Sequence, residues 1–378
     1  MKKVFLLTCM IAIFFNSSSA QEKLLDSLVS KNFLAFQPSK DNSFTGDGWN
    51  LLTKEINLAN SVLLGESHFT NEIPYFTNAL VNNFKFGSYF LEVDPYSTNF
   101  IHSKIKNSSA SQLNDFVSQY STNFSFLELK PEFELFKNVV SKDMKTFGIE
   151  QIYLDADQLI LSDLLEKSKN PKTKRIFEEM LLNSKKLALE DKESKYLFSD
   201  DCLQKINQLL ELKLTSAERK EIEDLKLSRD IYLNQNHPLR IQLMKHIILE
   251  NFSAFRDQKK LFKFGAVHLP KGETLLASYD IYDIGSLMYN LEEADFKKSL
   301  HIMVIGKSEG EIDEDDLPAS FLKVMNNKDW FCFDLRPLRK AITKNKLKID
   351  DTGLLRIIKG YDLLVYIPKL TDSKKLSN

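Results

Sequence analysis

The chain has 378 residues, with 51 basic and 52 acidic side chains and a formal charge of −1. Its hydrophobic fraction of 43%, with 28 Phe, is enough for a packed core and excludes wholesale disorder. The balanced charge excludes a protein that binds nucleic acid by neutralising phosphates, because such binding needs an excess of Lys and Arg.

The first twenty residues have the pattern of a secretory signal peptide. Lys2 and Lys3 precede an apolar run from Val4 to Phe15, and small residues follow up to Ala20. The apolar run is too short to cross a hydrocarbon core of roughly 30 Å as a helix. We therefore expect cleavage near Ala20 and export to the periplasm or the medium. Since no later run is long enough, we expect no transmembrane segment in the mature chain.

Two cysteines, Cys202 and Cys332, remain after residue 20. Two cysteines in a chain of this length do not make a disulfide framework, and we expect buried thiols, although a pair remains open. The chain has no close Cys/His cluster, which excludes a finger-type zinc site.

Short apolar runs alternate with helical patterns in the first part of the chain. Ser61–Glu66 and Ser88–Asp94 are predicted strands separated by a helix over Asn71–Asn83, which together form a βαβ unit with parallel strands. Met144–Glu150 is a third predicted strand.

From Asp155 to about Phe255 the pattern is that of long amphipathic helices, after which strands resume. The predicted fold class is α/β: a mostly parallel central sheet flanked by helices, with a large helical insertion over about 152–257, in a single domain spanning 21–378. The later predicted strands are Leu261–Val267, His301–Ile305, Trp330–Leu335 and Tyr361–Ile367.

Acidic and imidazole side chains lie at the ends of four predicted strands. Glu66 and His68 are two residues apart, so in an extended chain they share a face. A carboxylate beside an imidazole fixes its tautomer and raises its basicity, as a general base or a metal ligand requires. The carboxyl edge of a parallel sheet is where α/β folds bind ligands. The other strand-end residues of this kind are Glu92, Asp94, Glu150 and His268.

The predicted insertion adds Arg229 and Asp230, near the end of a helix predicted from Glu221 to about Asn236. Arg229 and Asn236 would share a helix face. The guanidinium could there bind an oxyanion or a substrate carboxylate, and the alternative is an ordinary ion pair on the helix surface. We interpret the remaining histidines and one Asp–Arg pair as structural, with His237 in a loop before Pro238; these residues are His102, His246, His301, Asp334 and Arg336.

Several short motifs resemble those of erythromycin esterase-like proteins. More broadly, they are similar to the superfamily that joins these to haem-binding ChaN-type, TraB and Tiki proteins. The resemblance covers about residues 60–368. The motifs are Gly65-Glu66-Ser67-His68 with Glu72, the strand-terminal Glu92, Ser228-Arg229-Asp230 with Asn236, and the run Lys263–His268.

The esterase branch implies a metal-independent hydrolase in which His68 activates water to attack an ester or related acyl bond of a small molecule. Glu66 and Glu92 would orient the imidazole or the water, and His268 and Arg229 would stabilise the oxyanion or bind substrate. We assign substrate binding to Glu72, Asp94, Glu150, Asp230 and Asn236.

Two other branches imply other chemistry. Gly65-x-x-His68 and Gly265-x-x-His268 resemble the paired motifs of the TraB/Tiki branch, which implies a metal-dependent peptidase with His68, His268 and Glu92 as ligands of a divalent metal. The ChaN branch implies non-catalytic binding of haem or an iron compound. The esterase hypothesis needs no cofactor.

Overall fold

The computed structural model describes residues 20–40, 43–191, 193–276, 278–308 and 317–377. The predicted signal peptide falls almost wholly on residues 1–19, which lie outside the described residues. Among the described residues, no helix combines the length and the apolar character needed to cross a membrane.

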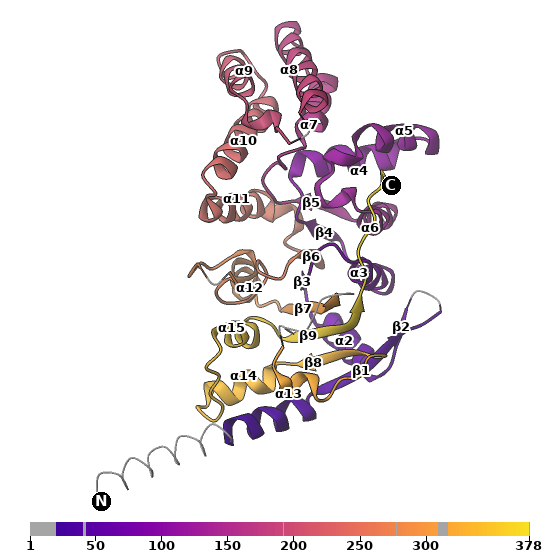
Figure 1. Ribbon diagram of the computed structural model, residues 1–378, viewed down its shortest axis with the longest axis vertical. Helices are drawn as coiled ribbons and strands as arrows, with labels where there is room; N and C mark the ends of the chain where they lie inside the picture. Colours follow the sequence, from indigo (N-terminus) through magenta and orange to yellow (C-terminus); the bar gives the residue numbers. More distant parts are fainter. Residues whose placement is uncertain (1–19, 41–42, 192, 277, 309–316, 378) are drawn as a thin grey trace, which may run out of the picture. The chain divides into compact units, whose positions relative to one another are not determined.

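The described residues form a mixed α/β structure with a mostly parallel sheet, as predicted (Figure 1). The strand order is β2-β1-β8-β9-β7-β3-β6-β4-β5. The strands are β1 (Phe33–Pro38), β2 (Phe44–Thr45), β3 (Ser61–Glu66), β4 (Ser88–Leu91), β5 (Lys145–Gly148), β6 (Lys260–Gly265), β7 (Ser299–Ser308), β8 (Trp330–Asp334) and β9 (Leu363–Leu370).

Helices connect most of these strands, and residues 20–31 are also helical. The α-helices are α2 (Asp47–Leu58), α3 (Glu72–Asn83), α4 (Pro95–Asn107), α5 (Ala110–Tyr120), α6 (Lys130–Ser141), α7 (Asp157–Lys167), α8 (Pro171–Glu190), α9 (Asp200–Leu210), α10 (Ser216–Leu233), α11 (His237–Phe255), α12 (Ile284–Ala294), α13 (Ala319–Leu322), α14 (Arg336–Thr343) and α15 (Thr352–Gly360). Short 3-10 turns are η1 (Ser121–Asn123), η2 (Ser125–Glu128) and η3 (Tyr196–Phe198).

The chain divides into two compact units, with one boundary inside β6. The first unit holds the described residues up to Ile73 together with Phe264–Asp372. The second unit holds Pro74–Lys263 and the residues from Ser373 on.

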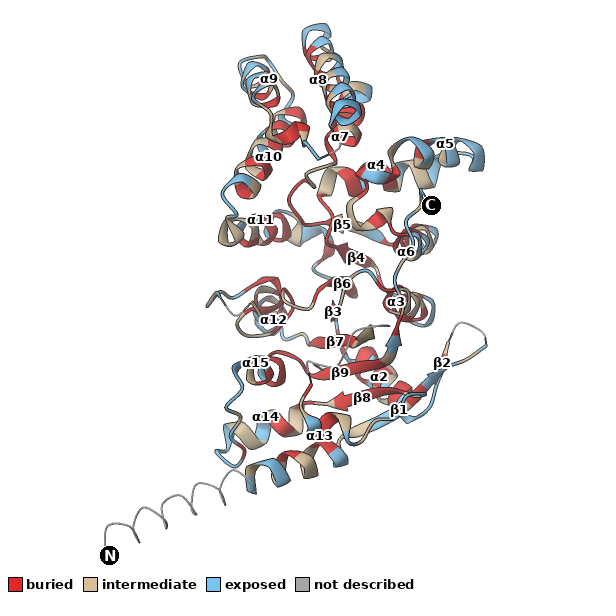
Figure 2. Ribbon diagram, viewed as in Figure 1, coloured by how far each residue is buried: buried red, intermediate tan, exposed pale blue. Residues whose placement is uncertain are grey.

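In the first unit, the predicted strand Ser61–Glu66 is confirmed with the same bounds as β3. All six of its residues are buried, as a strand covered on both faces requires (Figure 2). It pairs in parallel with β7, and β7 with β9. Strands β1, β2 and β8 form an antiparallel edge. Helix α12 packs against β3 and β7, and α2 packs against the edge strands β1, β2 and β8.

In the second unit, an aromatic stack crosses three parallel strands. Phe90 on β4 stacks on Phe147 of β5, with ring centroids 4.8 Å apart, and on Phe262 of β6 at 4.0 Å. The registers pair Phe90 with both residues directly. Such cross-strand aromatic pairs contribute about 0.2–1 kcal/mol each and favour this register over a slipped one.

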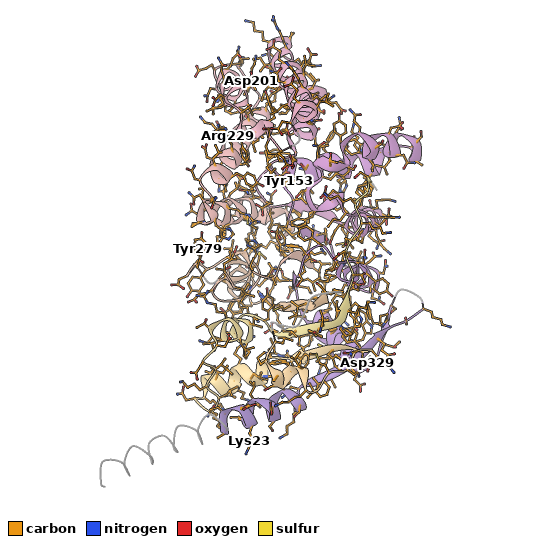
Figure 3. All side chains as sticks on the ribbon, in the orientation of Figure 1. Lys23, Tyr153, Asp201, Arg229, Tyr279 and Asp329 are labelled. Carbon is orange, nitrogen blue, oxygen red and sulfur yellow. The ribbon has the colours of Figure 1, made fainter. Side chains whose placement is uncertain are left out.

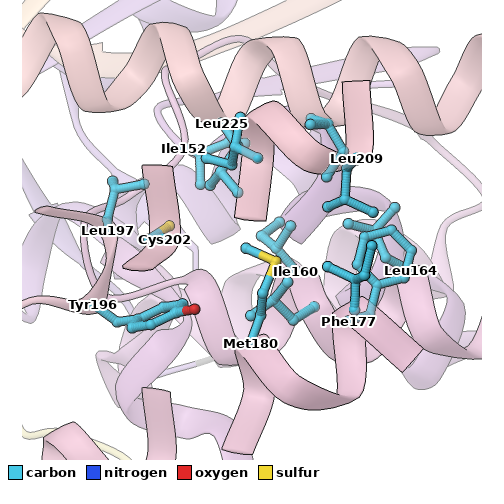
Figure 4. Packing of buried hydrophobic residues seen from close by; sticks show 14 of the residues in the cluster. Ile152, Ile160, Leu164, Phe177, Met180, Tyr196, Leu197, Cys202, Leu209 and Leu225 are labelled. Carbon is cyan, nitrogen blue, oxygen red and sulfur yellow. The ribbon is translucent and has the colours of Figure 1, made fainter. Parts of the chain in front are cut away.

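The predicted helical insertion corresponds to α7–α11, between β5 and β6. These helices have their own hydrophobic core, in which Ile160, Phe177 and Leu209 are fully buried (Figure 4). Cys202 is part of this core, and both Cys202 and Cys332 are buried free thiols, as predicted.

The predicted helix from Glu221 to about Asn236 is wrong at both ends. Helix α10 begins at Ser216, behind a capping box formed by Thr215 and Glu218, and ends at Leu233. Asn236 instead caps α11, accepting a hydrogen bond from Leu239 N at 3.1 Å. Proline fits the first turn of a helix, where no N–H partner is needed. Pro238 therefore lies in the first turn of α11, and His237 is the first residue of this helix rather than a loop residue.

Candidate functional site

The end of β3 carries a carboxylate–imidazole pair. Glu66 is the last residue of the strand, and its Oε1 lies 3.1 Å from Nδ1 of His68. The Glu66 side chain is 5% exposed and that of His68 24%, so solvent reaches mainly the imidazole. The expected contact between the two side chains is therefore present. Because Nδ1 faces the carboxylate, the pair favours the tautomer that leaves Nε2 without a proton.

The turn after β6 carries a second pair, deeper in the first unit. Nδ1 of His268 lies 2.7 Å from Oδ2 of Asp283, and both residues are fully buried. Asp283 also caps α12, where its other oxygen accepts the backbone N–H of Ile284 at 2.6 Å. Asp283 is not among the site residues predicted from the sequence. An Asp directly before an apolar helix start is a capping signal that could have drawn attention to it.

A backbone hydrogen bond joins the two histidine-bearing segments. The N–H of Ala266 donates to the carbonyl of Glu66 at 2.9 Å. Each histidine lies two residues beyond its partner in this bond, His68 after Glu66 and His268 after Ala266. The bond therefore joins the second residues of the two Gly-x-x-His segments.

The second unit has its own charged cluster after β4 and β5. Arg240, on α11, donates from Nη2 to Glu92 Oε1 at 2.8 Å and from Nε to Glu150 Oε1 at 2.9 Å. A further bond joins Nη2 to Oε2 of Glu150. Burial alone would lower the pKa of Arg240, but the two carboxylates raise it. The sequence predicted both acids but missed the arginine, which lies in no motif that we considered.

Asp94, assigned to substrate binding, caps a helix. Its Oδ1 accepts the backbone N–H groups of Tyr96 and Ser97 at 3.0 and 2.8 Å, at the start of α4. Asp94 is 1% exposed, and burial raises its pKa to about 6, against the effect of these hydrogen bonds.

Two other predicted substrate-binding residues form hydrogen bonds with residues of their own unit. Glu72, at the start of α3, accepts hydrogen bonds from Thr371 N at 2.8 Å and from its hydroxyl at 2.6 Å. Asp230 is half-buried on α10, and its backbone carbonyl accepts the side-chain amide of Asn234 at 2.8 Å. Their assignment to substrate stays a prediction.

Arg229 (labelled in Figure 3) is a buried residue of α10. Its Nη2 donates to the carbonyl of Phe198 at 3.2 Å. Burial raises the pKa of the Cys202 thiol to about 12, and the charge of Arg229 acts in the opposite direction. The argument that Arg229 and Asn236 share a helix face is wrong, because α10 ends before Asn236. Within the second unit, the guanidinium bound to Glu92 and Glu150 is that of Arg240.

The residues interpreted as structural have local partners. His301 is fully buried in β7, and its ring nitrogens contact Leu269 O at 2.7 Å and the Ser299 hydroxyl at 3.0 Å. Burial lowers its pKa to about 3, so it is neutral. The Asp334–Arg336 pair is present, with Nη2 and Oδ2 2.8 Å apart.

The first unit also contains a cavity of about 900 Å³, within the range of ligand sites. Its lining includes Val267, next to His268, and Met303 of β7. The polar groups around it include Lys348 and Asp351. Neither His68 nor His268 is among the lining residues.

The two pairs of the first unit also fit a metal-ligand role. Metal-binding histidines usually hold their second ring nitrogen against a carboxylate, which is the relation of His68 to Glu66 and of His268 to Asp283. This donor set suits a borderline metal such as zinc.

Comparisons of the whole chain show similarity in structure only. No protein-family profile and no curated sequence matches the chain. A structure from Bacillus cereus superposes with a TM-score of 0.57 at 16% identity, covering 93% of this chain and 98% of that one. A succinoglycan biosynthesis protein superposes with a TM-score of 0.56 at 15% identity, covering 93% and 98%.

A mutant of the erythromycin esterase EreC, in its open conformation, superposes with a TM-score of 0.56 at 14% identity, over 87% of this chain and 95% of that one. At such identities the likeness shows the fold alone. The chain therefore has the erythromycin esterase-like fold that its sequence motifs implied.

Proposed function

From this fold and its two histidine pairs, we propose that the chain is a hydrolase that cleaves an ester or related acyl bond of a small molecule, with His68 as the general base. The observation that carries the proposal is the contact of Glu66 with Nδ1 of His68 at a strand end. A histidine ordinarily has a pKa of about 6.5 and is largely neutral at physiological pH. A neutral imidazole held in this tautomer can take a proton from water at Nε2.

In the proposed reaction, water attacks the acyl carbonyl carbon as its proton moves to Nε2 of His68. The carbonyl π electrons move onto oxygen, forming a tetrahedral oxyanion. This intermediate collapses by breaking the bond to the leaving alcohol, which takes the proton from the imidazolium. Glu66 stabilises the imidazolium between these steps, in the manner of a triad acid.

We propose that His268 meets the oxyanion as an imidazolium. Its Nδ1 faces the Asp283 carboxylate at 2.7 Å, which fixes the orientation of the ring. Donors of this kind typically contribute about 10²–10³ in rate. The roles given to Glu92 and Arg229 stay predictions from the resemblance.

The test is hydrolysis of a panel of p-nitrophenyl and aryl esters by the full-length chain and by His68→Ala. We expect the substitution to abolish turnover while circular dichroism stays unchanged. His246→Ala is the matched control, because His246 is an exposed histidine whose contact is Glu250 of its own helix. Full activity of His68→Ala would exclude the proposal.

A metal-dependent peptidase is a second candidate, because both histidines have the carboxylate partner that metal ligands usually have. A bound divalent ion would supply an activated water. Elemental analysis and chelator treatment separate the two candidates. Hydrolysis that is unchanged in a metal-free preparation would exclude the peptidase, and loss of activity restored by zinc would exclude the metal-independent reaction.

We also propose that the protein acts after export. N-terminal sequencing of the protein from the periplasm or medium should begin at Gln21. A chain that retains Met1 in the cytoplasm would contradict this proposal.

A further inference from the structure

Tyr361 is a buried residue that contacts the turn before His268. It follows the last residue of α15, two positions before β9 begins, and none of its surface is exposed. Its hydroxyl donates to the backbone carbonyl of Ala266. The N–H of the same Ala266 donates to the carbonyl of Glu66. Ala266 is therefore hydrogen-bonded through both its N–H and its carbonyl group.

The same hydroxyl occupies the space beside Gly65. A Cβ added to Gly65 would overlap the Tyr361 hydroxyl oxygen and would lie 3.0 Å from both Cζ of Tyr361 and Cα of Ala266. The glycine of the first Gly-x-x-His segment is therefore needed for the close approach of this tyrosine, because any side chain would displace it.

A third element confines the other side of the turn. The N–H of Gly285, near the start of α12, donates to the carbonyl of His268 at 2.9 Å. A Cβ on Gly285 would overlap the backbone of Leu269. The segment from Ala266 to Leu269 is thus held by the end of β3, by Tyr361 and by α12.

We propose that Tyr361 is a positioning residue, whose hydroxyl fixes the His268 turn against the end of β3 and so sets the relation between His68 and His268. The proposal rests on the proposed function for its catalytic consequence, because Tyr361 acts through the two histidine segments. Its structural part stands on the contacts alone.

The tyrosine is suited to this task because its hydroxyl remains a donor. Burial and the charge of Asp283 both raise the pKa of Tyr361. The phenol is therefore protonated throughout the range in which histidine titrates.

The first experiment removes only the hydroxyl, with Tyr361→Phe in the full-length chain. We expect kcat to fall roughly tenfold with KM changed less than twofold, the scale of losing a group that orients a functional ligand. We also expect the imidazole ¹⁵N signals of His68 and His268 to shift in long-range ¹H–¹⁵N spectra. Tyr120→Phe is the matched control, since it removes a tyrosine hydroxyl contact with Ser162 in the second unit.

The second experiment uses Gly65→Ala alone and combined with Tyr361→Phe. The alanine methyl should lower the urea midpoint, and loss of the overlapping hydroxyl should restore part of it, so that the two effects are not additive. Strict additivity, or histidine signals that stay fixed in Tyr361→Phe, would overturn the proposal.

These readouts separate the two proposals. If the parent chain hydrolyses no ester but the histidine signals shift and the midpoints couple, the hydrolase proposal fails while Tyr361 remains a positioning residue. If hydrolysis is present and Tyr361→Phe leaves kcat and both signals unchanged, the positioning role fails alone.

Discussion

Ala266 donates its backbone N–H to the carbonyl of Glu66 at 2.9 Å, and this bond joins the second residues of two matching segments. The segments are Gly65-x-x-His68 and Gly265-x-x-His268. Because both segments have the same spacing, each histidine lies two residues beyond its residue in this bond, just after the end of β3 or of β6. The repeated motif therefore marks two chain segments that a backbone hydrogen bond joins at the ends of β3 and β6.

The first prediction concerns Glu66. Glu66→Gln keeps the size of the side chain but removes the charge that holds Nδ1 of His68 at 3.1 Å. We expect kcat for the best ester to fall at least tenfold, since the amide neither fixes the tautomer nor stabilises the imidazolium. Steady-state kinetics on the ester panel measures this. An unchanged kcat would mean that the carboxylate has no part in the reaction.

The second prediction concerns the buried pair. Asp283→Asn leaves an acceptor for Ile284 N but removes the charge facing His268. We expect a loss of about 1–3 kcal/mol in the free energy of unfolding, the cost of a poorly matched buried polar group. Urea unfolding followed by fluorescence gives the value. Asp350→Asn, at an exposed residue paired with Lys348, should change it by less than about 0.5 kcal/mol.

The fold could be predicted where the pattern is local. Ser61–Glu66 is a continuous apolar run that ends in charge, and β3 has the same bounds. Strand β1 was missed, because its alternation is interrupted and its pairing with β8 depends on residues some three hundred positions away. The boundary at His237 was misread since Pro238 can end one helix or begin the next, and the side-chain cap of Asn236 decides this.

The site could be predicted for pairs close in sequence and not for distant ones. Glu66 and His68 are two residues apart, so their contact follows from the period of two in an extended chain, although β3 itself ends at Glu66. Arg240 is 90 residues from Glu150, and Asp283 is 15 from His268 across a loop. The spacing of residues within one element does not predict such contacts. Arg229 was predicted from its position on a helix and from its motif, whereas in the structure its guanidinium donates to the carbonyl of Phe198.

The third prediction concerns Arg240. Arg240→Ala leaves Glu92 and Glu150, whose side chains are 7% and 9% exposed, without the guanidinium. We expect a loss of about 3–5 kcal/mol in the free energy of unfolding at pH 7, the scale for one partner of a buried ion pair.

Two variants make the Arg240 experiment specific. Arg175→Ala removes an arginine that is 81% exposed and paired with Glu179, and should cost less than about 0.5 kcal/mol. Arg240→Lys keeps the charge but cannot reproduce the fork that spans both carboxylates, so it should recover only part of the stability. Equal stabilities of the parent chain and Arg240→Ala would contradict the structural role of this cluster.

The fourth prediction follows from the raised pKa of Asp94, about 6 in the folded protein against 3.8 for the ordinary group. The folded state therefore holds the proton more tightly, so stability from this group is present below about pH 4 and falls as pH rises to about 6. Two pKa units correspond to about 3 kcal/mol, an upper bound here. Asp94→Asn keeps the cap but cannot ionise, so its stability relative to the parent chain should increase over this range.

Urea unfolding of both proteins between pH 4 and pH 8 tests this, with Asp351→Asn as the matched control. Asp351 is an exposed cap that accepts the backbone N–H of Leu354 at 2.7 Å, so its replacement makes the same change at a helix cap that is not buried. Steady-state kinetics of the Asp94→Asn variant provide a second test. If Asp94 serves only the start of α4, the Asn variant should keep KM for the best ester, whereas a role in substrate binding requires KM to rise. A parent chain that gains stability relative to Asp94→Asn as pH rises would contradict the raised pKa of this buried carboxyl group.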